Sequence, residues 1–328
     1  MIRLEAVAET FPIAGRFAIS RGARTEIHVV TVTLTDVHNG RAGRGECVPY
    51  ARYGESVEGV IAAIREQEEA LAAGLDRKGL QAAMPPGAAR NALDCAFWDL
   101  EAKTAGRSAA SLAGMSASAP LVTAYTLSLD TPEAMQASAA ANAARPLLKI
   151  KLGLEGDEAR LRAVRAGAPN ARLIVDANEG WSGDQLVPMM ALCAEMKVDL
   201  IEQPLPAKDD ALLARVAHPV PVCADESAHA LADFPALAGK YEAINIKLDK
   251  TGGLTEALAL KAAAEAAGMK VMVGCMLGTS LAMAPATLVA EGAAFVDLDG
   301  PLLLAADREP PLVFEGSIIR AVPSALWG

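Results

Sequence analysis

From Leu121 onward, short apolar runs alternate with longer helical stretches, and this alternation constrains the fold more than any other feature. Eight apolar runs follow one another, among them LLKIKLG, LIVDAN, LIEQPL and AINIKLD. No Asn-Gly hairpin signal joins neighbouring runs, which favours parallel strands with crossover helices. Eight such units in about 180 residues is the number and size of a compact (β/α)₈ barrel. We therefore predict an α/β protein built around a (β/α)₈-type barrel.

The residues before this region follow a different pattern. Alternating apolar and polar residues in IRLEAVAETF and HVVTVTLTD predict strands, and two helical patterns come next. A small, polar segment from Met115 to Pro120 marks a junction. We predict an α+β capping domain over residues 1–117 and a barrel carrying the catalytic and metal site over residues 118–302. The C-terminal segment, 303–328, is expected to return to the capping domain.

Charge and composition exclude some functions. A net charge of −10 argues against nucleic acid as the main partner, because phosphate binding requires clustered Lys and Arg. The sequence contains no run of 18 uncharged apolar residues, so it predicts no membrane-spanning helix. The five cysteines are odd in number and never spaced as CxxC, which is typical of reduced, buried thiols. With no apolar signal-peptide stretch near residue 1, we expect a cytoplasmic protein.

Charged side chains stand at the ends of the apolar runs, where a barrel builds its active site. These residues are Lys149, Lys151, Asp176, Glu202, Asp225, Lys247, Asp297 and Asp299. From Lys151 to Lys247, successive ends are 22 to 26 residues apart, which is one βα unit, so they share one rim. Any one of them could cap a helix or form a surface ion pair. As a set they indicate an active site.

Three of these residues predict a metal site. Asp176, Glu202 and Asp225 end three consecutive strands, and their charges would repel one another unless a cation lay between them. Their ligand atoms are all oxygens, and no His or Cys lies nearby in the pattern. Such a set favours a hard ion, Mg²⁺ first and Mn²⁺ as a substitute.

The lysines predict proton transfer. In a ring of eight strands the second and sixth lie opposite each other, so Lys151 and Lys247 should face each other across a substrate whose carboxylate rests on the metal. Lys149 is two residues before Lys151, so both point inward, and Lys149 would stabilise an enediolate with the metal. Two bases on opposite faces of one carbon suit racemisation or epimerisation. We expect Asp249 to hold the Lys247 ammonium.

Two further acids lie across the mouth of the barrel. Asp297 and Asp299 end the eighth strand, opposite the fourth, and both should point inward. Paired acids suit a substrate ammonium group. The alternative is a cap on the N-terminus of a helix in the last loop.

These motifs resemble a known family. KIK, VDAN, IEQP, ADES and NIKLDKTGG resemble the enolase superfamily in its muconate-lactonizing subgroup, and AARNALDCAFWDLEAKTAG resembles the signature of its capping domain. The resemblance covers essentially the whole chain. It implies an isomerase with a lysine base and one Mg²⁺ in each active site, a pattern already known for this superfamily.

Within the subgroup, Asp297-Leu298-Asp299 resembles the DxD of dipeptide epimerases, which binds the free amino end of the substrate. ISRGART and ECVPYARYGES resemble the capping loops of the same enzymes, and this implies that Arg24 meets a glutamate side-chain carboxylate. The alternative for Arg24 is a solvated surface side chain. The resemblance implies a small-molecule partner, a dipeptide.

The implied reaction is epimerisation of the C-terminal residue of a dipeptide, L-Ala-D/L-Glu, in murein peptide recycling. N-acylamino acid racemisation, muconate cycloisomerisation and o-succinylbenzoate synthesis are the alternatives within the superfamily. A barrel without turnover would require a broken catalytic residue, and the lysines and acids are all present. A homo-oligomer is the general expectation for such barrels.

Overall fold

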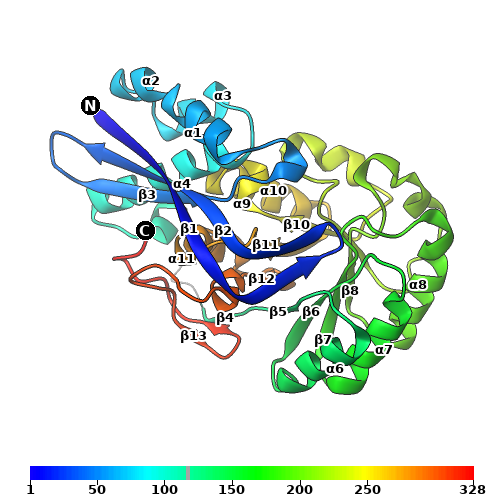
Figure 1. Cartoon of the computed structure of the whole chain (residues 1–328). Coiled ribbons are helices and arrows are strands. Elements are labelled where there is room, and N and C mark those ends of the chain that lie inside the picture. The colour runs from blue at the N-terminus through cyan, green and yellow to red at the C-terminus, as the bar shows by residue number, and fades with distance from the viewer. Residues whose placement is uncertain (116–118) are drawn as a thin grey trace.

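The N-terminal region is a three-stranded antiparallel sheet with helices packed against it (Figure 1). The computed structural model describes residues 1–115 and 119–328. The elements of this region are β1 (Ile2–Ile19), β2 (Gly22–Asp36), β3 (Ala42–Cys47), η1 (Ala51–Tyr53), α1 (Val57–Arg65), α2 (Glu68–Ala72), α3 (Arg77–Ala83), α4 (Ala88–Ala105) and α5 (Ala109–Leu112). Glycine allows α4 to lie close to β3, because a Cβ at Gly45 would lie 2.1 Å from the Ala92 carbonyl oxygen.

Eight parallel strands form the second region, in the order of the chain. They are β5 (Tyr125–Leu127), β6 (Leu147–Lys151), β7 (Arg172–Asp176), β8 (Leu200–Glu202), β9 (Val222–Ala224), β10 (Ala243–Ile246), β11 (Lys270–Gly274) and β12 (Phe295–Asp297). The ring is closed between its first and last strands, because Ala124 N donates to Val296 O at 2.8 Å and Leu298 N donates to Thr123 Oγ1 at 2.8 Å. The predicted barrel is confirmed.

One buried side chain from each strand region fills the barrel interior. These residues are Ala124, Leu147, Ile174, Leu200, Cys223, Ala243, Met272 and Phe295. Large and small side chains are mixed within this layer, which closes the barrel as a packed core and not a pore. The functional side chains therefore gather only at the other end, where the strands finish.

The crossovers differ in part from the prediction of a helix after every strand. Helices α6 (Pro132–Ala141), α7 (Asp157–Gly167), α8 (Gly183–Glu195), α9 (Leu248–Thr251), α10 (Leu254–Ala266) and α11 (Ser280–Ala290) follow β5, β6, β7, β10 and β11. The connections after β8 and β9 contain 3₁₀ turns instead, namely η2 (Ala207–Asp209), η3 (Ala211–Arg215) and η4 (Leu231–Leu237). Prolines at 204, 206, 219, 221 and 235 interrupt these segments and prevent a continuous α-helix. The first element after β12 is the 3₁₀ turn η5 (Gly300–Leu303).

The C-terminal segment contacts both regions. Strands β13 (Phe314–Glu315) and β14 (Ile318–Ile319) form a small sheet with β4 (Leu121–Val122). Farther along, Trp327 Nε1 donates to Cys95 O on α4 at 3.0 Å. The division into 1–117, 118–302 and 303–328 stays a proposal, and its first boundary lies outside the described residues. Within 1–115 and 119–328, no helix is both long and apolar enough to cross a membrane.

The β1–β2 hairpin lies against the barrel (blue in Figure 1). Ala18 N donates to Ser128 Oγ at 2.7 Å, and Leu129 N donates to Ala18 O at 3.0 Å. The turn of the hairpin is thereby held beside the ends of the barrel strands, where the charged residues lie.

Candidate active site

The lysines and acids predicted at the strand ends lie together at one end of the barrel. They are Lys149 and Lys151 on β6, Asp176 at the end of β7, Glu202 at the end of β8, and Asp225 and Lys247 directly after β9 and β10. The parallel register places Lys151 beside Asp176 and Asp176 beside Glu202. All of them are buried, with Lys151 the most exposed at 8%.

Lys149 lies among three carboxylates. Its Nζ is 2.7 Å from Glu202 Oε2, 2.7 Å from Asp297 Oδ2 and 3.3 Å from Asp176 Oδ2. Lys151 Nζ is 2.6 Å from the same Asp176 oxygen. Burial by itself lowers the pKa of Lys149, but the charges of Asp297, Glu202 and Asp176 outweigh burial and raise the pKa well above its usual value. Lys149 is therefore suited to stabilise negative charge as a permanent cation.

Asp225 is held by two lysines on the opposite side of the ring. Lys247 Nζ donates to Asp225 Oδ2 at 2.7 Å, and Lys250 Nζ donates to Asp225 Oδ1 at 2.6 Å. The buried Lys250 also donates to the Asn245 carbonyl oxygen at 3.0 Å. Lys250 was not predicted; its one signal is its position three residues after Lys247, in the short helix α9 that follows β10.

The expectation that Asp249 holds the Lys247 ammonium was wrong. Asp249 Oδ1 accepts hydrogen bonds from Val48 N at 3.0 Å and from Asn91 Nδ2 at 2.8 Å. Residue 247 is the N-cap of α9, so the helix begins there and turns the side chain of residue 249 toward the capping region. Asp249 thus connects the helix after β10 to the N-terminal region.

The chemistry of the predicted metal ligands fits a hard divalent cation. Burial, followed by the charge of Asp176, raises the pKa of Glu202 to about 7. Glu202 Oε2 has no aligned hydrogen-bond partner among the described residues, although the Lys149 ammonium lies 2.7 Å away. In the described part of the chain, no three His, Cys, Asp or Glu side chains are arranged to hold a metal ion, and the three predicted ligands are instead turned toward lysines. An oxygen-only, acid-rich set of this kind suits Mg²⁺ once the carboxylates turn to it.

The two acids of the eighth strand differ in their partners. Asp297 Oδ2 accepts a hydrogen bond from Lys149 at 2.7 Å, while the buried Oδ1 has no hydrogen-bond partner among the described residues. Asp299 Oδ2 accepts a hydrogen bond from Thr126 N on β5 at 2.6 Å. Burial and the charge of Asp297 raise the pKa of Asp299 to about 7. The side chain of Asp299 forms no cap on η5, which argues against the helix-cap alternative.

One pocket brings most of the predicted groups together. The predicted residues that line it are Lys149, Lys151, Asp225, Lys247, Asp297, Asp299 and Arg24. Apolar side chains, among them Phe17, Ile19 and Met276, form other parts of its wall. The pocket thus combines a few charged groups with an apolar lining, as small-molecule sites do.

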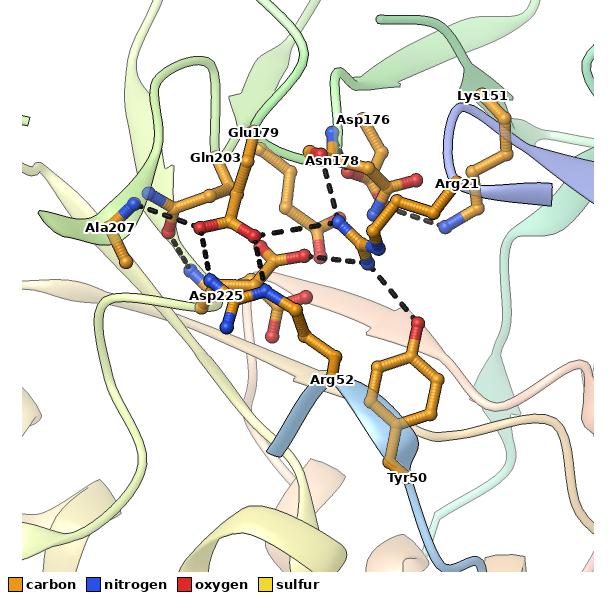
Figure 2. Close-up of polar contacts among 12 residues, drawn as sticks. Arg21, Tyr50, Arg52, Lys151, Asp176, Asn178, Glu179, Gln203, Ala207 and Asp225 are labelled. Atoms are coloured by element: carbon orange, nitrogen blue, oxygen red, sulfur yellow. Dashed lines mark hydrogen bonds and ion pairs between the residues drawn. The ribbon is translucent and has the colours of Figure 1, made fainter. Parts of the chain in front are cut away.

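Two arginines of the β1–β2 hairpin reach this pocket from the capping region. The Arg24 guanidinium lies 5.7 Å from the centre of the Tyr50 ring. Arg21, which was not predicted, donates to Asn178 O at 2.8 Å, to Glu226 Oε1 at 3.0 Å and to Tyr50 Oη at 3.1 Å (Figure 2). Sequence position alone could not find Arg21, because its partners lie 29 to 205 residues away along the chain.

A second capping loop holds the loop that follows Asp176. Arg52 in η1 forms two hydrogen bonds to Glu179, both at 2.8 Å (Figure 2). Asn178 and Glu179 have φ angles of 46° and 67°, a left-handed conformation that is uncommon for residues with a side chain. Such strain is typical of functional sites and persists only where the surroundings hold it. Arg21 and Arg52 supply that support here.

Two family models match the chain. The model described as enolase C-terminal domain-like matches residues 133–318, and the model of the mandelate racemase / muconate lactonizing enzyme N-terminal domain matches residues 1–114. The chain therefore belongs to the enolase superfamily, in the group that contains mandelate racemase and muconate lactonizing enzyme. The family predicted from the motifs is confirmed.

Two proteins similar in sequence to this chain are named as an epimerase and a racemase of amino acid derivatives. The chain is 48% identical over 308 residues to the L-Ala-D/L-Glu epimerase of Escherichia coli (strain K12), covering 93% of this chain and 95% of the relative. It is 44% identical over 288 residues to the N-acetyl-D-glutamate racemase of Pseudoalteromonas sp, covering 87% and 91%.

Solved structures show the same likeness. An enolase family member from Agrobacterium tumefaciens, solved with sodium and L-Ala-L-Glu, has a TM-score of 0.98 and 60% identity, covering 100% of both chains. The dipeptide epimerase of Cytophaga hutchinsonii, complexed with Mg and D-Ala-L-Val, has a TM-score of 0.91 and 28% identity, covering 97% of this chain and 92% of that one.

Proposed function

We propose that this protein is a Mg²⁺-dependent isomerase that epimerises the C-terminal residue of a dipeptide, with L-Ala-D/L-Glu as its substrate. The observation that carries the proposal is the placement of Lys151 and Lys247 in one pocket together with Asp297 and Asp299. Strands β6 and β10 are four apart in a ring of eight, so the two lysines approach the pocket from opposite sides. One similar protein is named L-Ala-D/L-Glu epimerase, and another was solved with L-Ala-L-Glu bound.

The two lysines act as the acid and base of a 1,1-proton transfer. One lysine removes the α-proton of the C-terminal residue as a neutral amine, and the other, as an ammonium, returns a proton to the opposite face. The roles exchange when the other epimer is the substrate. Lys149, which remains a cation, stabilises the negative charge that develops on the substrate carboxylate.

Asp176, Glu202 and Asp225 would hold the Mg²⁺. When bound, the cation supplies Lewis-acid stabilisation of the substrate carboxylate as its enediolate forms. Because Asp176 pairs with Lys151 and Asp225 pairs with Lys247, turning these carboxylates away also frees the two proposed bases to exchange protons, while Lys149, which pairs with Glu202, remains a cation. The ligand arrangement and the base chemistry are thus linked through two of the same three acids.

The remaining charged groups select the substrate. Asp297, whose Oδ1 has no hydrogen-bond partner among the described residues, and Asp299 would receive the free ammonium group of the dipeptide. Arg24 lines the same pocket from the capping region and would pair with the glutamate side-chain carboxylate. The substrate charge pattern, one cation and two anions, matches these groups.

A second candidate is racemisation of an N-acylated amino acid such as N-acetylglutamate, in which the ammonium group is absent. Two observations favour it besides the 44% identity to the N-acetyl-D-glutamate racemase. Lys149 already pairs with Asp297, and the pKa of Asp299 is raised to about 7, so covering the two acids with a neutral acyl group costs less desolvation than covering two unpaired carboxylates would. The first candidate accounts better for the unpartnered oxygen of Asp297.

Turnover of two matched substrates separates the candidates. The purified protein with Mg²⁺ is incubated with L-Ala-L-Glu and, separately, with N-acetyl-L-Glu, and the epimers are resolved by chiral chromatography. The proposal expects a kcat/KM for the dipeptide at least tenfold higher. A higher kcat/KM for N-acetyl-L-Glu would replace it with the second candidate, and no turnover of either would refute both.

We also propose that the enzyme serves murein peptide recycling in the cytoplasm and forms a homo-oligomer. All five cysteines are free, and four of them are buried, which agrees with a reducing compartment. Size-exclusion chromatography with light scattering tests the oligomer, and dipeptide accumulation in a deletion strain tests the role.

A further inference from the structure

Gln203 directly follows Glu202, and its side chain is fully buried. Gln203 Oε1 accepts hydrogen bonds from two backbone N–H groups, Asp225 N at 2.9 Å and Ser227 N at 3.0 Å. Nε2 donates to the Leu205 carbonyl oxygen at 2.9 Å. The side-chain amide therefore connects the end of β8 to the residue that follows β9. Both places hold a proposed metal ligand, Glu202 on β8 and Asp225 after β9.

The backbone of Gln203 extends the link to the third proposed ligand. Gln203 N donates to Cys223 O on β9 at 2.9 Å, and Gln203 O accepts from Glu179 N at 2.9 Å. Glu179 belongs to the loop that follows Asp176, and Figure 2 shows Gln203 lying beside this residue. Gln203 has a φ of 33°, in the left-handed region, so its conformation must be maintained by these bonds.

A buried to half-buried cluster of hydroxyls and a carboxylate holds the amide in place. Gln203 Nε2 also lies 2.9 Å from Ser227 Oγ and 3.1 Å from Tyr241 Oη. Both hydroxyls donate to Asp210 Oδ2, at 2.9 Å from Ser227 and 2.7 Å from Tyr241. Lys240 pairs with Asp210 Oδ1 at 2.6 Å. A buried network with every member bonded in this way is rigid, and it fixes which way the amide faces.

We infer that Gln203 is a positioning residue that sets the spacing of Glu202 and Asp225 for a divalent cation, with Tyr241, Ser227 and Asp210 as its support. The inference rests on the proposed function, because the assignment of these two carboxylates as ligands belongs to it. Loss of a partner that orients a metal ligand typically costs 10 to 100-fold in metal affinity. Gln203 acts through the backbone of Asp225 and needs no contact with the ion.

The test measures metal affinity without turnover. Mn²⁺ is titrated into the apoprotein at fixed pH and salt, and free Mn²⁺ is followed by electron paramagnetic resonance. The variant Gln203→Met keeps the size of the side chain and removes all its hydrogen bonds. The matched control is Gln81→Met in α3, where the glutamine amide bonds to Asp94 Oδ1 and the Arg77 carbonyl oxygen. We expect the Mn²⁺ dissociation constant to rise at least tenfold in Gln203→Met and to stay at the parent value in Gln81→Met.

An unchanged dissociation constant in Gln203→Met would overturn the inference, whatever happens to its melting temperature. If Gln203→Met does not fold, the Tyr241→Phe variant is measured in its place. A Mn²⁺ dissociation constant at least threefold above the parent value supports the inference, and the parent value overturns it. A parent protein that binds no Mn²⁺, or a Glu202→Gln variant that binds it as well as the parent, would refute the metal site itself. These outcomes separate a failure of the positioning role from a failure of the proposed function.

Discussion

Asp94 makes the stability of this protein depend on pH in a way that a single substitution removes. Asp94 lies on α4 and accepts hydrogen bonds from Thr255 N at 2.9 Å, Thr255 Oγ1 at 2.6 Å and Gln81 Nε2 at 2.8 Å. Thr255 stands in the first turn of α10, so this carboxyl joins the capping region to the barrel. Burial outweighs the hydrogen bonds and raises the pKa of Asp94 from 3.8 to about 6.

The sign follows from proton linkage. Between about pH 4 and pH 6 the unfolded chain releases a proton that the folded protein keeps, so the free energy of unfolding decreases as the pH rises. A pKa difference of about two units corresponds to ~3 kcal/mol in full, and ~1.4 kcal/mol of this lies between about pH 5 and pH 7.5. This decrease in the free energy of unfolding is complete above the pKa of Asp94 in the folded protein and absent below its pKa in the unfolded chain.

Asp94→Asn should abolish this dependence because an amide does not titrate. Its oxygen can still accept from Thr255 N, and the new N–H group faces Gln81, whose Oε1 is buried without a hydrogen-bond partner among the described residues. Urea unfolding of parent and variant, followed by circular dichroism at pH 5 and pH 7.5, measures the difference. We expect the stability of the variant relative to the parent to increase by ~1.4 kcal/mol over this range. A difference that is the same at both pH values would refute the reasoning.

Four substitutions test the proposed reaction. Lys151→Ala and Lys247→Ala should each reduce epimerisation below detection, at least a thousandfold, since each removes one of the two bases; parental turnover in either, measured by chiral chromatography, would exclude the two-base mechanism. Asp297→Asn should raise KM for the dipeptide at least tenfold and change the Mn²⁺ dissociation constant less than threefold, and equal losses would contradict its role at the substrate ammonium. Arg24→Met should raise KM for L-Ala-L-Glu at least tenfold but leave KM for L-Ala-L-Met within threefold, and a similar rise for both dipeptides would show that Arg24 does not read the glutamate carboxylate.

The positions of the candidate site residues were predictable because they depend on local rules. Alternation along a strand places Lys149 and Lys151 on the same side, and regular spacing of the apolar runs places Asp176, Glu202 and Asp225 on one rim. The barrel itself followed from the same pattern. Their roles as bases and metal ligands are still predictions.

The partners of these side chains were not predictable, because they depend on contacts between segments far apart in the chain. Asp249 turns toward Asn91, 158 residues away, and not toward the neighbouring Lys247. Lys250 and Gln203 reach Asp225 through the packing of the loops that follow the strands. The 3₁₀ crossovers after β8 and β9 could have been anticipated from their prolines, which break the helical pattern.

Proton exchange at the α-carbon of the C-terminal residue tests the proposed reaction most directly. L-Ala-L-Glu is incubated with the protein and Mg²⁺ in D₂O, and the products are analysed by mass spectrometry after separation of the epimers. We expect L-Ala-D-Glu to appear with a single deuteron at the α-carbon, supplied by the second lysine from solvent. Dipeptide recovered without deuterium and without the D-epimer would contradict the proposed epimerisation of this substrate.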